Sequence, residues 1–426
     1  MNSRSAIHAI FLTSFLSTVS GVNAAGLWIY ERGQSDIGVA NAGRMASAQD
    51  ASTTANGNPA GMTRIDGHEV VFGVQPMYLD LKFDPGAGTT NSGGDGGNAG
   101  GFIPGMGMGA VYSVNERLKL GLGFGSFFGV SADWDDDWVG RYFAKELTFM
   151  TMAAMPSVAY KFNDWLSVGA GVSVVSGQLE SKVAVNNILD ALPDGEMKFK
   201  GDDVGFGFSP SILIEPIEGT RFGLVYTTEV SQEYEDRPRF TGLGPGLKAA
   251  LGMAGVLGSK LELDYDLPQG VMFSAYHELN DKWAIMGNFG WQDWASFGDV
   301  GISISKNDGS AGGATVDSFL DDTYHGAIGV VYGLNDKWDL MAGFAYDSSP
   351  VDDKDRNIQT LFDEQLRYGA GARYQMKENL SFDFAYELVD LGKNKMDTSG
   401  ELSGRLQGDF SEHFLHIVNM MVRWQF

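Results

Sequence analysis

The chain ends in the stretch HFLHIVNMMVRWQF, residues 413–426, in which two kinds of side chain alternate. Successive side chains of a β-strand point to opposite faces, so every second residue shares a face. One face carries the polar residues Asn419, Arg423 and Gln425. The other face is apolar apart from His416 and holds Phe414, Val418, Met420, Val422, Trp424 and Phe426. One face suits lipid and the other suits a wet lumen, which is typical of a strand in a membrane β-barrel.

The same alternation recurs from Gly67 onward in stretches of roughly ten residues, the length that a tilted strand needs to cross a bilayer. After the N-terminal region, no window approaches the roughly 18 consecutive apolar residues of a membrane helix. Short turns, mostly marked by Asn, Asp or Gly, occur at residues 115–117, 163–165, 216–219, 280–283, 335–338 and 377–379. Long polar segments lie near residues 84–104, 129–146, 178–204, 230–265, 296–321, 348–362 and 390–412.

Six turns and seven loops separate fourteen strands, and an even number of strands returns both ends of the chain to one side of the membrane. We therefore expect an all-β fold, a transmembrane antiparallel β-barrel of 14 strands formed by residues 67–426. Its short turns would face the periplasm. A soluble sandwich or propeller is the alternative fold, which the asymmetric loops and the terminal Phe426 disfavour.

The N-terminal region divides into two parts. Arg4 precedes an apolar run and then the small-residue stretch GVNA, residues 21–24, so residues 1–24 are expected to be a secretory signal peptide. Residues 25–66 do not alternate and are rich in small and polar residues. A barrel of this width has a water-filled lumen unless something occupies it, so we expect residues 25–66 to form a hatch inside the barrel. A disordered periplasmic tail is the alternative.

The composition excludes several classes of function. Acidic residues outnumber basic residues 54 to 30, for a net charge of −24, which disfavours nucleic-acid binding. The absence of Cys excludes disulfides, thiolate metal sites and a cysteine nucleophile. The six His residues accompany neither a Gly-x-Ser-x-Gly element nor a His-Glu-x-x-His pair. We therefore do not expect the protein to be an enzyme, and we expect it to have no catalytic residue, metal or cofactor.

Acidic residues cluster at 133–137, 233–236 and 352–355, each time in a turn-rich segment between apolar runs. Solvated loops are the simpler interpretation of these clusters. The alternative is a divalent-cation site that bridges loops or lipopolysaccharide, because such cations prefer several carboxylate oxygens.

Several short motifs follow one another in an order that resembles the FadL family of outer-membrane long-chain fatty-acid transporters. They are AGL (25–27), NPA (58–60), SFFG (126–129), DDDWVGRY (135–142), PSVAYKFNDWLSVGAGV (156–172), EPIEGTRFGLVY (215–226), AYHELNDKWAIM (275–286), AYDSSPV (345–351) and the terminal WQF. The resemblance covers the whole mature chain. It implies a monomeric barrel, surrounded by outer-membrane lipid and lipopolysaccharide, that takes up hydrophobic molecules without energy input.

The resemblance also implies roles for single residues. The hatch would include Ala25, Gly26, Leu27, Asn58, Pro59 and Ala60. A kink in the third strand, near Phe128 and Gly129, would open the wall so that ligand leaves sideways into the bilayer. Glycine tolerates the backbone angles of such an interruption. Alternatively, the glycines of this strand simply pack against the hatch.

Two long loops contain apolar residues at helical spacing, within residues 183–192 and 243–257. The resemblance implies that these loops form an outer groove that captures ligand first. Packing that merely caps the barrel is the alternative. The candidate groove residues are Val185, Ile188, Leu189, Leu247 and Leu251.

A fatty-acid carboxylate in a desolvated site needs a cationic or hydrogen-bonding partner. Alternation places several bases on inward faces, and we rank Lys161 and Arg373 first among them. Arg141, in the WVGRY element, is a third candidate or else a residue that orders its loop. Salt bridges to the hatch are the alternative role for these bases. One departure from the family pattern, DDKDRNIQTLFDEQLR after AYDSSPV, leaves the shape of the sixth loop open.

The expected function is therefore passive uptake of hydrophobic small molecules, with long-chain fatty acids favoured over aromatic or aliphatic hydrocarbons. Two functions of other classes remain as alternatives. A general porin for hydrophilic solutes would need an open lumen, and an adhesin or phage receptor would use the exposed loops.

Overall fold

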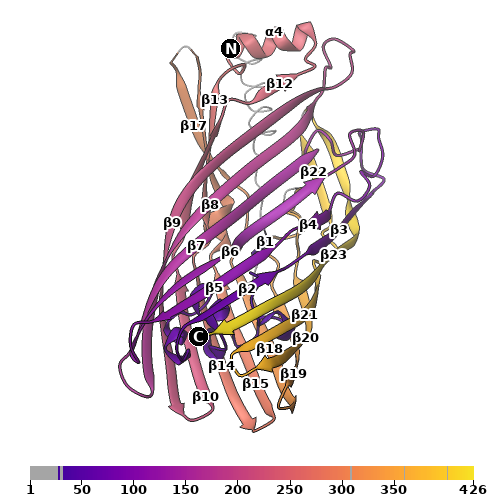
Figure 1. The fold of residues 1–426 in the computed structure, drawn as a ribbon. Helices are drawn as coiled ribbons and strands as arrows, with labels where there is room; N and C mark the ends of the chain where they lie inside the picture. The colour runs from indigo at the N-terminus through magenta and orange to yellow at the C-terminus, as the bar shows by residue number, and fades with distance from the viewer. Residues whose placement is uncertain (1–26, 29–31, 308, 359, 401) are drawn as a thin grey trace.

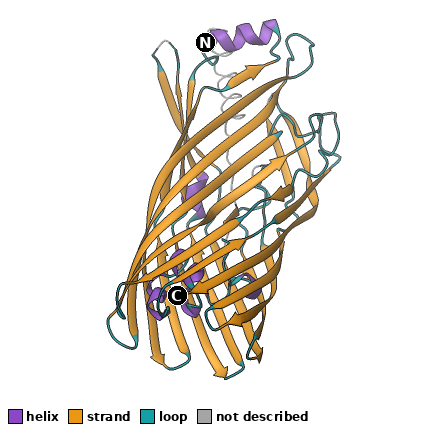
Figure 2. Cartoon of the chain, viewed as in Figure 1, coloured by secondary structure: helices purple, strands orange, loops and turns teal. Residues whose placement is uncertain are grey.

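The computed structural model describes residues 27–28, 32–307, 309–358, 360–400 and 402–426. The expected signal peptide, residues 1–24, lies outside these ranges, as do Ala25 and Gly26. Most of the described strands form one large sheet that curves into a tall tilted barrel (Figures 1 and 2). The sheet closes because β2 (Glu69–Val74) pairs with both β5 (Met106–Ser113) and the final strand, β23 (Gly404–Gln425).

The wall is a closed antiparallel barrel of 14 strands, as the sequence predicts. The first two strands are each broken into two pieces. The first consists of β2 and β3 (Met77–Pro85), and the second of β4 (Gly101–Ile103) and β5. The remaining strands are β6 (Leu118–Asp133), β7 (Glu146–Lys161), β8 (Leu166–Val185), β9 (Gly195–Ile217), β10 (Thr220–Thr227), β14 (Gly270–Asn280), β15 (Trp283–Gln292), β18 (Thr323–Asn335), β19 (Trp338–Asp347), β20 (Gln365–Lys377), β21 (Leu380–Asp390) and β23.

The outer surface of the wall is apolar. On β23, Val418, Met420 and Trp424 are 42%, 41% and 53% exposed, whereas Asn419 between them is 1% exposed. The inner face is not entirely polar, because Met421 is buried there in one cluster with Ala51 and Ala55 of the N-terminal segment. Within the described residues, no helix is long and apolar enough to cross a bilayer.

Residues 32–66 lie inside the ring of strands (Figure 2). They form four short helices, η2 (Ile37–Val39), α2 (Arg44–Ser47), α3 (Ala51–Asn56) and η3 (Pro59–Arg64). Glycines of the wall allow the hatch backbone to approach closely. A Cβ atom on Gly343 would overlap the carbonyl oxygen of Val39, and one on Gly223 would overlap that of Met45. Steric fit therefore positions this segment, which we call the hatch.

Buried ion pairs also connect the hatch to the wall. Asp50 caps α3 by accepting hydrogen bonds from two backbone N–H groups, and Arg373 of β20 lies 3.5 Å from its carboxylate. Arg373 also pairs with Asp383 of β21 at 2.7 Å. At the seam between β2 and β23, Glu69 accepts from the Ala51 N–H at 2.6 Å and pairs with Arg423. Because these charges are buried, breaking one partner would leave the other uncompensated.

A second sheet of four strands lies at the upper end of the barrel in Figure 1, the end that is expected to be extracellular. Its inner face packs against the barrel through aromatic contacts such as Phe149 with Tyr265, whose ring centroids are 5.8 Å apart. Much of the chain expected to be loop is therefore β-structure. The strands of this sheet are β11 (Val230–Asp236), β13 (Lys260–Leu267), β16 (Asp299–Ser305) and β17 (Ala311–Asp317). The remaining elements are β1 (Leu27–Trp28), β12 (Arg239–Thr241), β22 (Met396–Gly400), α4 (Pro245–Met253) and α5 (Trp294–Gly298).

The glycine contacts predict that Gly343→Val displaces the hatch from a barrel that still folds. Valine suits a strand, but its side chain overlaps the hatch backbone, at a cost of about 1–3 kcal/mol. Trypsin should then cleave after Arg44, which is buried in the parent protein. Gly326→Val on the neighbouring strand is the matched control, because a Cβ atom there meets no atom within 4 Å. Equal cleavage of the two variants would contradict this account of hatch docking.

Candidate functional site

The wall is interrupted beside β6. The ladder between β5 and β6 ends at the pair Met108–Phe124, and no described residue of β4 pairs with β6 above it. On its other edge, β6 shifts register against β7 between Gly125 and Phe128. Here the N-terminal segment takes the place of a wall strand, because the backbone of β1 pairs with Phe128 and Gly129. A piece of chain that is not part of the barrel therefore covers a gap in the barrel.

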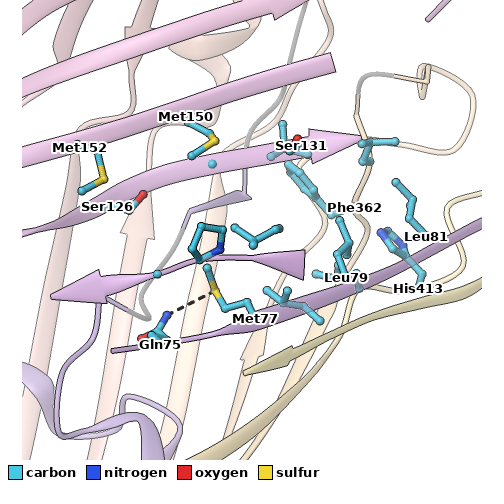
Figure 3. A pocket seen from close by; sticks show the side chains of 18 of the residues that line it. Gln75, Met77, Leu79, Leu81, Ser126, Ser131, Met150, Met152, Phe362 and His413 are labelled. Carbon is cyan, nitrogen blue, oxygen red and sulfur yellow. Dashed lines mark hydrogen bonds between the residues drawn. The ribbon is translucent and has the colours of Figure 1, made fainter. Parts of the chain in front are cut away.

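A cavity lies at this gap (Figure 3). Met150 and Met152 lie on one side of it, opposite Met77 and Leu79 on the other. The lining combines residues that face the lumen with residues on the outer surface, so the cavity crosses the wall. Leu81 is fully buried, whereas Met106 is 50% exposed. The lining residues are Gln75, Met77, Leu79, Leu81, Ile103, Pro104, Gly105, Met106, Ser126, Gly129, Val130, Ser131, Met150, Met152, Leu361, Phe362, Leu391, His413 and Leu415.

The chemistry of this wall cavity is apolar. No Lys, Arg, Asp or Glu is among the described residues that line it. Its polar side chains are already engaged: Gln75 accepts from the Gly33 N–H at 2.7 Å, Ser126 donates to the Thr151 carbonyl, and His413 contacts Asn394 at 2.7 Å. An unpaired charge would be costly here, whereas alkyl chains and aromatic rings fit well. The cavity can therefore admit the hydrophobic part of a ligand.

The residues expected at the lateral opening lie beside this cavity. Gly129 lines it, and Phe128 is fully buried behind it, with its ring centroid 5.1 Å from that of Phe149 and 5.6 Å from that of Trp294. The predicted hatch residues lie in two places. Leu27 pairs with Gly129 through the backbone, whereas Asn58, Pro59 and Ala60 begin η3. Asn58 caps this helix and donates to the carbonyls of Met45 and Ile212. It thereby connects two parts of the hatch to the wall.

The expected outer groove has only part of its predicted form. Residues 243–257 contain the helix α4, on which Leu247 and Leu251 are buried. The helical expectation for residues 183–192 is wrong, because β8 continues to Val185 and a turn follows. The strand continues because its hydrogen-bonded pairing with β9 extends beyond the wall.

Exposed apolar side chains remain at this outer tip. Ile188 and Leu189 are 66% and 57% exposed, and Met253 of α4 is 75% exposed. The two loops are joined, because Asp190 accepts hydrogen bonds from the N–H groups of Gly246 and Leu247 at the start of α4. Their role in capturing ligand stays a prediction.

The three predicted head-group residues do not line the wall cavity. Arg373 pairs with Asp383 and Asp50 at the interface between wall and hatch. Lys161 lies at a short turn between β7 and β8, 3.2 Å from Asp164. Arg141 pairs with Asp194 at 2.8 Å, bonds to Tyr142 and donates to the Ser92 carbonyl in the extracellular loops. Contact between these residues and a ligand stays a prediction.

The sequence interpretation missed the break of the first wall strand into β2 and β3, the break of the second into β4 and β5, and the methionines that surround the wall cavity. Two prolines carried a signal for these breaks. Pro76 separates β2 from β3, and Pro104 separates β4 from β5. Proline cannot donate to a ladder, so it disfavours a continuous central strand. The four methionines lie on three different strands, and their proximity could not be derived from spacing along the chain.

One acidic cluster, on the outer face of the extracellular sheet, has the spacing of a cation site. Glu233, Glu235 and Glu262 can bring one carboxylate oxygen each within 4.8 Å of the others. Lys260 already forms ion pairs with Glu235 and Glu262. The hydrogen bond with Glu235 and the charge of Glu262 raise the pKa of Glu233 above its usual value. A carboxyl group with a raised pKa stabilises the fold at low pH, and this contribution is lost as the pH rises through the folded-state pKa.

We therefore predict that protonation of Glu233 stabilises the strands β11 and β13 as the pH falls from 7, whereas protonation of Glu235, whose pKa is lowered by its hydrogen bond with Lys260, opposes this effect at lower pH. Glu233→Gln should raise their stability at neutral pH and weaken the pH dependence, because the repelling charge is removed. Hydrogen exchange of residues 230–267, corrected for the intrinsic rate at each pH, measures both effects. Ser231→Ala, on the same exposed face, should show the same pH dependence of hydrogen exchange as the parent protein. If Glu233→Gln did not change this pH dependence, its assignment to Glu233 would be wrong.

The chain was compared with protein families and known proteins. Residues 15–426 match the model of the family described as outer membrane protein transport protein (OMPP1/FadL/TodX). The chain is 26% identical to outer membrane protein P1 of Haemophilus influenzae, with 89% of this chain and 88% of that protein covered. It is also 26% identical to a long-chain fatty acid transport protein of Escherichia coli, with 89% of each covered.

Two solved structures share the fold. A FadL homologue of Pseudomonas aeruginosa superposes with a TM-score of 0.84 at 23% identity, covering 94% of this chain and all of that one. The toluene transporter TbuX of Ralstonia pickettii gives a TM-score of 0.65 at 17% identity, covering 90% of this chain and 97% of that one.

Proposed function

The chain belongs to the OMPP1/FadL/TodX family of outer membrane transport proteins, and from this premise we propose that it is a channel for passive uptake of long-chain fatty acids. The family consists of outer-membrane transporters of hydrophobic compounds, so this chain is such a transporter and not an enzyme. Our proposal adds the substrate class, long-chain fatty acids, and the route through the barrel wall. It also holds that the protein is a monomer surrounded by outer-membrane lipid and lipopolysaccharide.

The observation that carries the proposal is the apolar cavity that crosses the wall. A hydrophobic molecule in the lumen gains little by leaving through a hydrated opening, because its apolar surface would return to water. A cavity lined on one side by Leu79 and Leu81 and on the other by Met106 and Met150 keeps that surface covered. The ligand then passes from the lumen to the acyl-chain region without crossing water.

The hatch is the proposed gate. The backbone pair between Leu27 and Gly129 covers the gap in the wall, so ligand can leave only after this short pairing yields. The described part of this pairing, Leu27 and Trp28 with Gly129 and Phe128, is short compared with the long strand pairings of the wall, so it breaks more easily. In this mechanism Phe128 and Gly129 form the lateral opening, and the apolar tip with Ile188 and Leu189 collects ligand first.

Fatty acids are favoured over hydrocarbons by two observations. Several relatives at 25–26% identity are named long-chain fatty acid transport proteins, whereas the toluene transporter TbuX is 17% identical to this chain. The inward-facing surface also carries bases, as binding of a carboxylate requires, although the predicted candidates Arg373 and Lys161 already pair with acidic residues. Uptake of aromatic or aliphatic hydrocarbons by the same route is the alternative.

Uptake by cells tests the function. A strain without its own hydrophobic uptake channel should accumulate labelled oleate when it expresses this chain, and labelled toluene to a smaller extent. Deleting residues 25–66 should change the rate, because the hatch controls access to the wall cavity. If neither compound entered cells that contain the protein in their outer membrane, the proposed function would be wrong.

Filling the wall cavity tests the route. Ser131→Trp places a bulky side chain in the cavity lining, and we expect oleate uptake to fall several-fold without loss of folded protein. Thr148→Trp is the matched control, because Thr148 pairs with Ser131 across β6 and β7 but does not line the cavity. Equal initial uptake rates for the two variants would exclude exit through this cavity.

A further inference from the structure

A second cavity lies in the lumen, between the hatch and the opposite part of the wall. Its lining is divided by chemistry. The hatch contributes Arg32 and Arg44, whereas the wall contributes Met155, Val225 and Met272. Ser209, Thr227 and Gln292 add polar groups. A site with cations and hydrogen-bonding groups on one side and flexible apolar side chains on the other suits an amphiphile with an anionic head.

Arg32 lies between this lumen cavity and the wall cavity. Its Cβ atom would be 3.3 Å from a Cβ atom built on Gly125, where β6 changes register. The next residue, Gly33, donates its N–H to Gln75, which lines the wall cavity. The guanidinium group of Arg32 donates to the Asn56 carbonyl at 3.2 Å, and both residues line the lumen cavity. Arg32 thus lies beside β6 at the interruption of the wall and also lines the lumen cavity.

We propose that Arg32 binds the carboxylate of a fatty acid in the lumen cavity, before the hydrocarbon chain enters the wall cavity. This inference rests on the proposed function and names a head-group residue for it. A guanidinium group has five N–H donors in a planar fork, so it can hold a carboxylate while it keeps a backbone acceptor. Arg32 is 7% exposed, and a charge-assisted hydrogen bond is strong where water is excluded.

Two neighbouring arginines already hold carboxylates. Arg44 holds Asp36 through two hydrogen bonds of 2.5 and 2.9 Å and also donates to Asn41. Arg367, in the adjoining cavity that shares Gln292, lies 3.0 Å from Asp347 and 3.9 Å from Glu387. A ligand carboxylate near either arginine would meet the repulsion of carboxylates already bound there.

The two cavities therefore divide the recognition of one ligand. The lumen cavity distinguishes a carboxylate from an uncharged group, whereas the wall cavity, whose described lining carries no Lys, Arg, Asp or Glu, accepts any apolar chain. Removing the charge of Arg32 should accordingly affect fatty acids and spare uncharged molecules of the same length.

Binding of oleate and oleyl alcohol to the purified full-length protein tests this. Arg32→Gln keeps a side chain of similar shape and polarity without the charge. It should weaken oleate binding by roughly ten- to hundredfold, the value of hydrogen bonds to charged groups, and leave oleyl alcohol binding unchanged. Arg64→Gln is the matched control, because Arg64 is also a hatch arginine but pairs with Glu215 outside both cavities. It should leave both ligands unaffected.

Two results would overturn the inference while the proposed function stands. Oleate binding unchanged in Arg32→Gln would exclude a head-group role, and equal weakening of both ligands would show that Arg32 only supports the cavity. Migration of unheated protein in gels verifies that each variant forms a folded barrel. If the parent protein bound neither ligand, the proposed function would fail and this inference with it.

Discussion

The need to pair every backbone N–H and C=O group within the bilayer governs this structure. Lipid offers no hydrogen bonds, so the strands must close into a ring, and any break in the ring needs a substitute partner. The ring closes through β2 and β23 and breaks beside β6, where β1 supplies the missing hydrogen bonds. A partner that is not part of the wall can leave it. The same constraint that closes the barrel therefore defines where it can open.

Charges and apolar surfaces are separated in a way that follows from this arrangement. The ion pairs at the hatch, such as Arg373 with Asp50 and Arg423 with Glu69, are buried and mutually compensated. The wall cavity is lined instead by aliphatic and thioether side chains. Buried charge fixes the hatch at one position, while the adjacent apolar lining leaves the route for a hydrophobic ligand free of desolvation cost.

Much of the wall could be predicted from sequence, because alternation is a local property. Residues 413–426 identify a lipid-facing strand, and the six short turns set the number of strands. Partners across the lumen could not be predicted in this way. Alternation placed Arg373 on the inner face, but only the folded hatch shows that Asp50 lies next to it. The four-stranded extracellular sheet was also missed, because its acidic outer face made residues 230–265 resemble a solvated loop.

The attachment of the hatch is unequal at its two ends. Its C-terminal end continues directly into β2, which β23 holds in the seam of the barrel, whereas near its N-terminal end β1 makes a two-residue pairing. The seam therefore holds the hatch at its C-terminal end, whereas the described contact of its N-terminal end with β6 is a single short pairing. In the proposed function, this short pairing is the contact that opens the exit, so the hatch can uncover the gap in the wall without leaving the seam.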